Sequence, residues 1–302
     1  MVSRYCELPV GYQDGAGKIH RRAVFRSLSG REEEVLASSH NGVPSASLVS
    51  EVLASCLTEL GDISPITVDI ARQLTVVDQQ HLLLQLRSIT FGENVQAVVQ
   101  CPAEGCGEKV DIDFKISQLP TAKPGGEREH EFILSEPAIS QLENHQKQSV
   151  RFRLPVGEDQ EMIASIADVN EAEALTKLLS RCLISVGDIE HPTLDQTRTL
   201  PSLVRREIEQ HLEEASPGTE LIMDIECPEC GQPFSAPFNI QDFFFGELRI
   251  SDAILRKEVH YLAYHYHWSE AEIMAMPRQR RRQYIDTLSE EIERMNDAAQ
   301  YV

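Results

Sequence analysis

Two cysteine-containing turns, far apart in the chain, hold the residues best suited to chemistry. The first reads Cys101-Pro-Ala-Glu-Gly-Cys106-Gly and the second Cys227-Pro-Glu-Cys230-Gly. Such a turn, here called a knuckle, directs two thiolates to one point, and the following glycine lets the backbone fold back behind them. Because zinc in structural sites takes four ligands, we expect Cys101, Cys106, Cys227 and Cys230 to share one Zn²⁺ ion.

The first knuckle has four residues between its cysteines instead of two, so a tight turn without metal is the alternative there. A redox-active pair is less favoured, because neither knuckle opens a helix in a strand–helix unit. Four thiolates leave no open coordination position, so the predicted zinc is structural. Its binding would contribute on the order of 10 kcal/mol to folding.

Composition narrows the class of protein. The 302 residues are 41% hydrophobic and 25% charged, as in globular proteins, and the formal net charge is −20. This charge argues against binding of a nucleic-acid backbone and suits a basic protein partner. No run is long enough to span a membrane, and the seven cysteines, an odd number, indicate a reducing cytoplasm. No phosphate-binding loop, nucleophile elbow or catalytic acid pair occurs, so we do not expect an enzyme.

The spacing of the cysteines indicates an internal repeat. Cys56 precedes Cys101 by 45 residues, and Cys182 precedes Cys227 by the same number. Cys56 and Cys182 lie in apolar helical patterns and are predicted core residues. We predict an α+β fold made by internal duplication of a mainly helical unit. Each copy contains a short zinc-ribbon hairpin, and a helical C-terminal tail follows.

The predicted organisation has five parts. They are an extended N-terminal segment (1–22), copy 1 with the first knuckle (23–119), a linker (120–149), copy 2 with the second knuckle (150–245) and the helical tail (246–302). The linker is predicted from the Pro- and Gly-rich composition of residues 120–130.

Hydrophobic periodicity and capping residues predict the individual elements. Helices are expected over 30–38, 46–60, 75–91, 170–185, 200–215, 252–266 and 269–276, with one more to the end. Strands are expected over 23–28, 66–70, 95–100, 109–114, 131–134, 149–154, 220–226 and 234–240.

The tail contains the one strong basic cluster of this acidic chain: Arg278, Arg280, Arg281 and Arg282. Together with Trp268 and Tyr284 it is the predicted partner-binding surface. Contact with an acidic protein surface, or with the protein's own acidic face, is favoured over nucleic acid because of the overall charge.

Several motifs carry a family resemblance: Leu8-Pro-x-Gly-Tyr12, Arg26-x-Leu-x-Gly30-x-Glu-Glu, Phe91-Gly92, both knuckles and Phe243-Phe244. With these motifs, residues 5–245 resemble the baseplate-hub protein family of T-even phages, which is also found in contractile injection systems. The segment from Val259 to Leu288 resembles a small helical protein of injection-system clusters and the C-terminal part of phage tail-assembly chaperones.

The resemblance implies a part of, or a helper for, a contractile-tail baseplate, with the baseplate hub, tail tube or tape-measure proteins as partners. It places the protein in the bacterial cytoplasm during assembly. Two interpretations stay open: a structural component kept in the particle, and an assembly chaperone that leaves it. A zinc-ribbon regulator that binds nucleic acid is a third, against which the charge counts.

Overall fold

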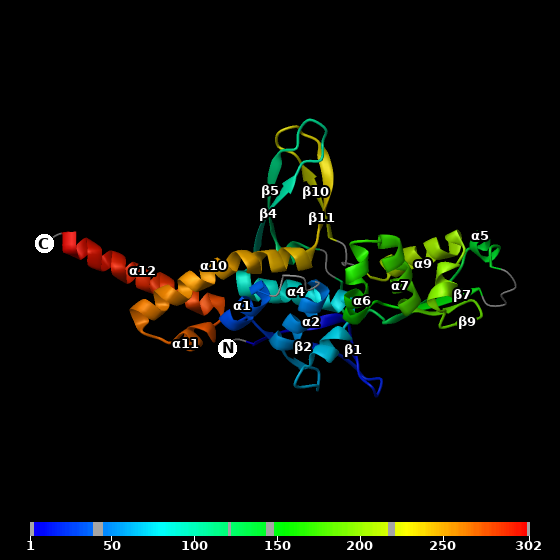
Figure 1. Ribbon diagram of the computed structural model, residues 1–302, viewed down its shortest axis with the longest axis horizontal. Coiled ribbons are helices and arrows are strands. Elements are labelled where there is room, and N and C mark those ends of the chain that lie inside the picture. Colours follow the sequence, from blue (N-terminus) through cyan, green and yellow to red (C-terminus); the bar gives the residue numbers. More distant parts are fainter. Residues whose placement is uncertain (1–2, 39–44, 120–121, 143–147, 217–220, 301–302) are drawn as a thin grey trace.

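The computed structural model of the chain describes residues 3–38, 45–119, 122–142, 148–216 and 221–300. The molecule is elongated, with a central unit, a second unit at one end and the C-terminal helices at the other (Figure 1). Two β-hairpins stand side by side and project from one side of the centre (Figure 1).

The central unit contains a three-stranded antiparallel sheet in the order β1-β2-β3. Its strands are β1 (Ser3–Gln13), β2 (Ile19–Arg26) and β3 (Leu57–Leu60). Its helices are α1 (Gly30–Ser38), α2 (Ser45–Cys56), α3 (Val68–Arg72) and α4 (Val76–Phe91). The first projecting hairpin follows as β4 (Asn94–Gln100) and β5 (Lys109–Lys115), and the 3-10 turn η1 (Ile116–Gln118) ends the unit.

The second unit contains a four-stranded antiparallel sheet in the order β6-β7-β8-β9. Its strands are β6 (Glu129–Ile133), β7 (Ser149–Arg153), β8 (Leu183–Val186) and β9 (Ile189–Glu190). Its helices are α5 (Glu136–Ile139), α6 (Gly157–Ala167), α7 (Glu171–Cys182), α8 (Leu194–Arg198) and α9 (Ser202–Glu214). The second projecting hairpin is β10 (Leu221–Glu226) with β11 (Pro233–Phe238).

Each unit has its own apolar core, and the two cores meet. Leu48, Leu53 and Leu83 are buried in the central core. The core of the second unit also takes up Val10 of β1 and Val77 of α4. Backbone hydrogen bonds cross the same junction, from Val76 N to Pro155 O at 2.9 Å and from Gly157 N to Leu74 O at 3.1 Å. The two units are therefore joined directly, apart from any contact between the hairpins.

Most elements of the central unit recur in the same order in the second unit, together with equivalent ion pairs. In the central unit β2 pairs with β3, and in the second unit β7 pairs with β8. The register of these two pairs shifts at equivalent places, at Phe25 and at Phe152. Arg26 pairs with Glu32 in the central unit, and Arg153 pairs with Asp159 in the second unit. β9 and α5 have no counterpart among the named elements of the central unit.

Two predicted helices are shorter than expected, for one reason. The helices predicted over 46–60 and 170–185 end at Cys56 and Cys182, and the next four residues form β3 and β8. These strands pair with β2 and β7, whose edges would otherwise have unpaired backbone groups. Ladder hydrogen bonds formed with a distant strand therefore outweigh the local helical pattern.

Other predictions changed at the ends of the chain and around the linker. The strand predicted over 66–70 is instead helix α3, whose first turn is capped by the Thr67 hydroxyl accepting from Ile70 N. The segment 1–22, predicted to be an extended lead-in, contains β1 and the start of β2 in its described part, and these two strands pair as a hairpin. The linker contains β6 and α5, while residues 120–121 and 143–147 lie outside the described residues.

The C-terminal helices are α10 (Ile240–Tyr266), α11 (Glu270–Met274) and α12 (Arg278–Gln300). α10 starts before residue 246, so one continuous helix crosses the boundary predicted there. Its first turns are part of the central core, because Phe244, Phe245 and Leu248 are buried in it. The capping box predicted for Ser269 and Glu272 is present at the start of α11.

Candidate functional site

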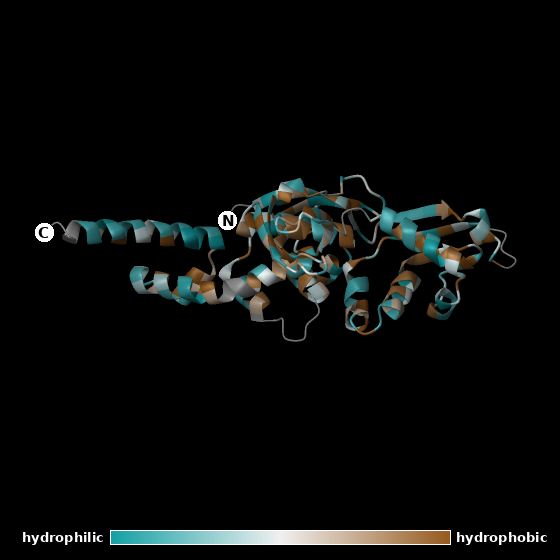
Figure 2. Cartoon of the chain, turned by 90° about the horizontal axis from the view of Figure 1, so that it is seen from above, coloured by the Kyte–Doolittle hydropathy of each residue, from teal (hydrophilic) through white to brown (hydrophobic). Residues whose placement is uncertain are grey.

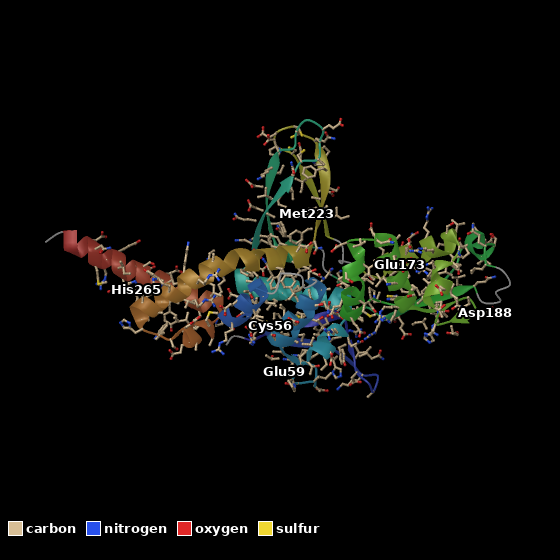
Figure 3. All side chains as sticks on the ribbon, viewed as in Figure 1. Cys56, Glu59, Glu173, Asp188, Met223 and His265 are labelled. Atoms are coloured by element: carbon tan, nitrogen blue, oxygen red, sulfur yellow. The ribbon has the colours of Figure 1, made fainter. Side chains whose placement is uncertain are left out.

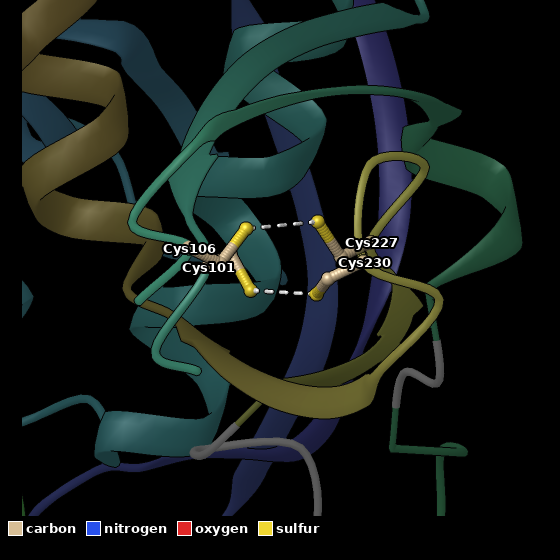
Figure 4. A group of neighbouring side chains, drawn as sticks. All are labelled: Cys101, Cys106, Cys227 and Cys230. Carbon is tan, nitrogen blue, oxygen red and sulfur yellow. Dashed lines mark hydrogen bonds between the residues drawn. The ribbon is translucent and has the colours of Figure 1, made fainter. Parts of the chain in front are cut away.

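The two projecting hairpins bring the four knuckle cysteines together. Cys101 and Cys106 lie in the turn between β4 and β5, and Cys227 and Cys230 in the turn between β10 and β11. Their sulfur atoms all lie within 4.8 Å of one another. Figure 4 shows the two pairs facing each other across the gap between the hairpins. The sequence prediction that the two knuckles meet is therefore confirmed.

The knuckle backbones follow from the position of glycine. Gly107 and Gly231 each follow the second cysteine of their knuckle and have φ values of 64° and 69°. Only glycine adopts this left-handed region without strain, which lets each chain turn back into its second strand. The turns are closed by hydrogen bonds from Cys101 N to Glu108 O and from Cys227 N to Gln232 O. The extra residues of the first knuckle therefore do not prevent the turn from closing.

The spacing of the sulfur atoms can be compared with what a metal requires. Cys101 Sγ lies 3.7 Å from Cys230 Sγ, and Cys106 Sγ lies 3.8 Å from Cys227 Sγ. Tetrahedral zinc with Zn–S bonds of about 2.3 Å puts its sulfur ligands roughly 3.8 Å apart. The four cysteines are thus compatible with a metal site that draws two ligands from each hairpin.

The surroundings of the cluster favour a thiolate at Cys227. Hydrogen bonds from the amides of Cys230 and Glu229 lower the pKa of the Cys227 thiol to about 7. Cys101 and Cys227 are buried, and Val110 is buried beside them in a small core at the tip of the hairpins. Despite an amide hydrogen bond from Glu108, burial and the neighbouring thiols raise the pKa of Cys106 to about 12, and the pKa of Cys101 is raised as well. Metal ligands must be deprotonated, so a bound cation would have to displace the protons of these two thiols.

The remaining cysteines lie elsewhere. Cys56 and Cys182 are each 1% exposed, as expected of core residues. Figure 3 shows Cys56 within the central unit and Met223 near the base of the hairpins. Burial raises the pKa of both thiols, Cys56 and Cys182, to about 12, which suits a packing role.

The predicted basic cluster divides between the interior and the surface. Arg281 is fully buried and donates to Glu33 of α1 at 2.9 Å and to Glu258 of α10 at 3.0 Å. It pairs with the protein's own acidic side chains, which was one of the two alternatives for this cluster. The other alternative, contact with an acidic surface of a partner protein, is wrong for Arg281, because this side chain is buried.

Arg278 and Arg282 line a polar cleft of about 990 Å³ between α4, β4 and α12. The Arg278 guanidinium lies 4.9 Å from the centre of the Phe91 ring, while Arg282 is about half exposed and pairs with Glu258. Arg4 and Arg87 also line the cleft, as do the acids Glu93, Glu247 and Asp286. The cleft thus joins part of the predicted surface to the central unit.

The other three predicted residues form an aromatic cluster at the start of α12. Trp268 stacks on Tyr266, with ring centres 4.6 Å apart, and meets Tyr284 edge-on at 4.8 Å. The Arg280 guanidinium lies over the Tyr284 ring at 5.9 Å. Trp268 and Tyr284 are half-buried and Arg280 is exposed, so this aromatic cluster presents one edge to solvent.

Sequence reasoning missed the acidic partners of these arginines. Glu33 and Glu258 are 1% and 7% exposed, and Glu247 of α10 holds Arg87 through two hydrogen bonds. Glu33 is the second acid of the Arg31-Glu-Glu-Glu run, where any of the acids could have complemented the helix dipole. No feature of the neighbouring sequence distinguishes Glu33 from the other two acids, because its partner Arg281 is 248 residues away in the chain.

Among the residues that the structure describes, no helix is both long and apolar enough to cross a membrane. A family model described as T4 bacteriophage base plate protein matches residues 3–245. A second, described as a family of unknown function (DUF6760), matches residues 249–302. The comparisons with curated proteins and with solved structures each returned no match.

Proposed function

Because the chain belongs to the T4 bacteriophage base plate protein family, we propose that it is a structural component of a contractile-tail baseplate, in a phage or in an injection system. The match over residues 3–245 carries this proposal, and it confirms the resemblance that the sequence motifs indicated. The protein acts without catalysis, through contacts with other proteins. It assembles in the bacterial cytoplasm and stays in the baseplate of the finished particle.

We further propose that Cys101, Cys106, Cys227 and Cys230 bind one structural Zn²⁺ ion. The sulfur–sulfur distances of 3.7 and 3.8 Å support this, since they match two edges of a zinc tetrahedron. The ion ties the hairpin of the central unit to that of the second unit, as two halves of one zinc ribbon. The scaffold would then present its surfaces in a fixed arrangement.

An internal duplication is the simplest origin of this scaffold. The repeated element order and the equivalent ion pairs support it. So do Gly61 and Gly187, whose φ values are 58° and 57° and whose amides bond to Arg22 O and Ser149 O. Each copy carries one knuckle, so each is incomplete as a metal site without the other.

The partner-binding surface is assigned to the C-terminal end. It consists of the exposed Arg280 and Arg282, the half-buried Trp268 and Tyr284, and Arg278, which lines the cleft. Baseplate hub, tail tube and tape-measure proteins are the proposed partners. An acidic segment of such a protein would suit the exposed Arg4 and Arg282 of the cleft, whereas Arg87 there is already paired with Glu247.

A tail-assembly chaperone, absent from the mature particle, is the second candidate. The far half of α12 stands away from the rest of the molecule (Figure 1), as a helix that grips a client would. In this case the zinc-stapled scaffold would carry the helix without entering the particle.

Quantitative mass spectrometry of purified particles, beside the lysate that produced them, separates the two candidates. A fixed ratio to the baseplate subunits of a few copies per particle supports the structural role. Presence in the lysate together with absence from washed particles would overturn it in favour of the chaperone. Metal analysis of the same purified protein tests the zinc, with about one ion per chain expected.

A further inference from the structure

An apolar groove lies between α10 and α12, next to the polar cleft. It has a volume of about 580 Å³ and is lined by Ile254 and Tyr261 of α10 and by Ile285 and Ser289 of α12. Ile254 is 37% exposed and also lines the polar cleft, so the groove and the cleft adjoin at this side chain. Exposed apolar side chains gathered in a groove indicate a surface that packs against another polypeptide.

The α10 wall of the groove is basic. Arg256, Lys257 and His260 line it, and all three are exposed. The described lining contains one acid, Glu258, which is 7% exposed and already accepts a hydrogen bond from Arg281 at 3.0 Å. An occupant of the groove would therefore meet cations along its rim, and a carboxylate beside its apolar face would be attracted to them.

The chain's own α12 is a poor occupant for the groove of a second copy. Its far half extends clear of the other elements (Figures 1 and 2) and has an apolar seam of Leu288, Ile292 and Met295. Four of the five exposed acids of this half lie on the side opposite the seam, given 100° of rotation per residue. The fifth, Glu291, is paired with Arg294. The helix that the groove requires carries its acids beside its apolar stripe instead.

We propose that the groove binds an amphipathic helix of another protein, with carboxylates flanking its apolar stripe. The stripe packs on Ile254, Tyr261 and Ile285, and the carboxylates face Arg256 and Lys257. Burial of the stripe supplies the affinity, while charge at the rim contributes specificity and the rate of association. A nucleic acid fits less well, because it has no apolar stripe and the net charge of −20 repels it.

The adjoining cleft offers the same segment a path toward the central unit. Beyond Ile254 the cleft presents Arg4 and Arg282, both exposed. It is also lined by amide side chains, which can donate to and accept from a polypeptide backbone: Asn94, Gln96, Gln279 and Gln283. The inference rests on the proposed partner-binding role of the C-terminal end, and it adds that the bound segment is helical and apolar on one face in the groove.

Fluorescence anisotropy with the full-length protein tests the groove, and designed helical peptides serve as probes. The acidic probe has leucine at the a and d positions of about three heptads and glutamate at the flanking positions. A second probe has lysine in place of every glutamate, and a third has glutamine in place of every leucine. We expect the acidic probe to bind at least about tenfold more tightly than the lysine probe, and the glutamine probe not to bind measurably.

Variants of the chain separate the apolar contact from the charge. Ile254→Gln should weaken binding of the acidic probe by about tenfold, because it places a polar group in the apolar groove. Lys257→Glu should weaken it by about three- to tenfold and should strengthen binding of the lysine probe. The matched control is Lys109→Glu, which makes the same charge change on an exposed residue of β5 and should leave both affinities nearly unchanged.

The three substituted positions are exposed, so the melting temperature of each variant should stay that of the native protein. Equal binding of the acidic and lysine probes, or equal binding by Ile254→Gln and the native chain, would overturn the proposal. A photo-crosslinker at position 261 in producing cells then identifies the natural occupant. Links to a helix of another protein with acids beside an apolar stripe support the proposal, and links to a second copy or to a basic segment contradict it.

A second photo-crosslinker, at position 280, distinguishes failure of this inference from failure of the proposed function. Arg280 belongs to the proposed partner-binding surface but does not line the groove. Links from position 280 without links from position 261 would overturn the groove alone. Absence of links from both positions would overturn the partner-binding role of the C-terminal end as well, whereas the place of the protein in the particle is decided by mass spectrometry of the particles.

Discussion

At the scale of single residues, the two knuckles are unequal in exposure. Cys101 and Cys227 are 2% and 0% exposed, whereas Cys106 is half-buried and Cys230 is exposed. A buried thiolate without a metal would be costly, so the two inner cysteines depend most on a bound cation. The sequence could identify all four cysteines as candidate ligands from their spacing, but it could not rank them by exposure, because burial depends on how the two hairpins pack together.

Cys227→Ser is expected to abolish stoichiometric zinc binding, since a serine hydroxyl is a poor replacement for a thiolate ligand. The melting temperature should fall as well, because metal binding is coupled to folding. Inductively coupled plasma mass spectrometry and calorimetry measure the two effects. The control is Cys6→Ser, which alters a half-buried cysteine of β1 outside the cluster. Unchanged zinc content in Cys227→Ser would show that the four cysteines do not share an ion.

Asp159 provides a test of pH dependence. Burial by itself would raise the pKa of this carboxyl, but hydrogen bonds from Arg153, the Val156 amide and Arg181 hold it below its ordinary value. A group with a lowered folded-state pKa stabilises the protein above its unfolded pKa of about 3.9 and loses this effect as pH falls through the folded value. The contribution is therefore complete at neutral pH.

Asp159→Asn should lower the free energy of unfolding at pH 7 by about 2–4 kcal/mol, because two guanidinium groups lose their counter-charge. The difference in free energy of unfolding between variant and native protein should become smaller once the pH falls below about 4. Urea unfolding at a series of pH values measures it, and comparison at equal pH removes any shared effect of metal loss. A gap that stays constant into the acid range would contradict the role of the charge.

At the scale of elements, the C-terminal helices are built into the central unit rather than attached to it. α10 crosses the boundary between the two family matches as one helix. Gly30 at the start of α1 donates from its amide to Met276 O at 3.3 Å, and Ser29 pairs with Pro277. An added Cβ at Gly30 would lie 3.0 Å from Met274 Sδ, so glycine permits this close contact.

Arg281→Ala is expected to loosen this docking by up to roughly 3 kcal/mol, because it leaves the buried Glu33 and Glu258 with only the longer contacts to Arg278 at 3.9 Å and Arg282 at 3.5 Å. Hydrogen exchange should quicken in α1, α11 and the base of α12, and in few other places. The matched control is Arg280→Ala, one position earlier on the same helix and exposed. Equal protection in the two variants would show that the buried ion pairs do not hold the helices in place.

The elements themselves show what local sequence can and cannot predict. α4 was predicted closely, since Thr75 caps it and Gly92 ends it, and both signals lie in the chain itself. β3 and β8 were missed because their strand character comes from β2 and β7, more than 25 residues away. The basic cluster was seen as one feature, although helical rotation sends Arg281 inward and Arg280 and Arg282 outward.

At the scale of the whole molecule, the hairpins and the unit junction make two separate connections. The hairpin tips of the two units meet at the four cysteines and the small apolar core around them. At the base the units are joined where the chain enters α4 and α6, through hydrogen bonds of Val76 with Pro155 and of Gly157 with Leu74. The sequence repeat predicted the first connection. It contained no signal for the second, because a contact between two copies is not part of the pattern that they share.

The two connections predict a graded response to loss of metal. A chelator strong enough to remove zinc should quicken hydrogen exchange in β4, β5, β10 and β11, because two-stranded hairpins are marginal by themselves. The units should stay together, since the junction and the shared packing of Val10 and Val77 are unaffected. The radius of gyration from small-angle scattering should therefore change little, while the melting temperature falls.

Re-addition of Zn²⁺ should restore protection in the hairpins, and Cys227→Ser should show the fast exchange before any chelator is added. This control separates metal loss from other effects of the chelator. Separation of the units, seen as a large rise in the radius of gyration, would mean that the metal alone holds the scaffold. Unchanged exchange in all four strands would mean that the hairpins pack without it. If a metal holds the hairpin tips and the packed junction holds the base, removal of the metal should reduce hydrogen-exchange protection only in these four strands.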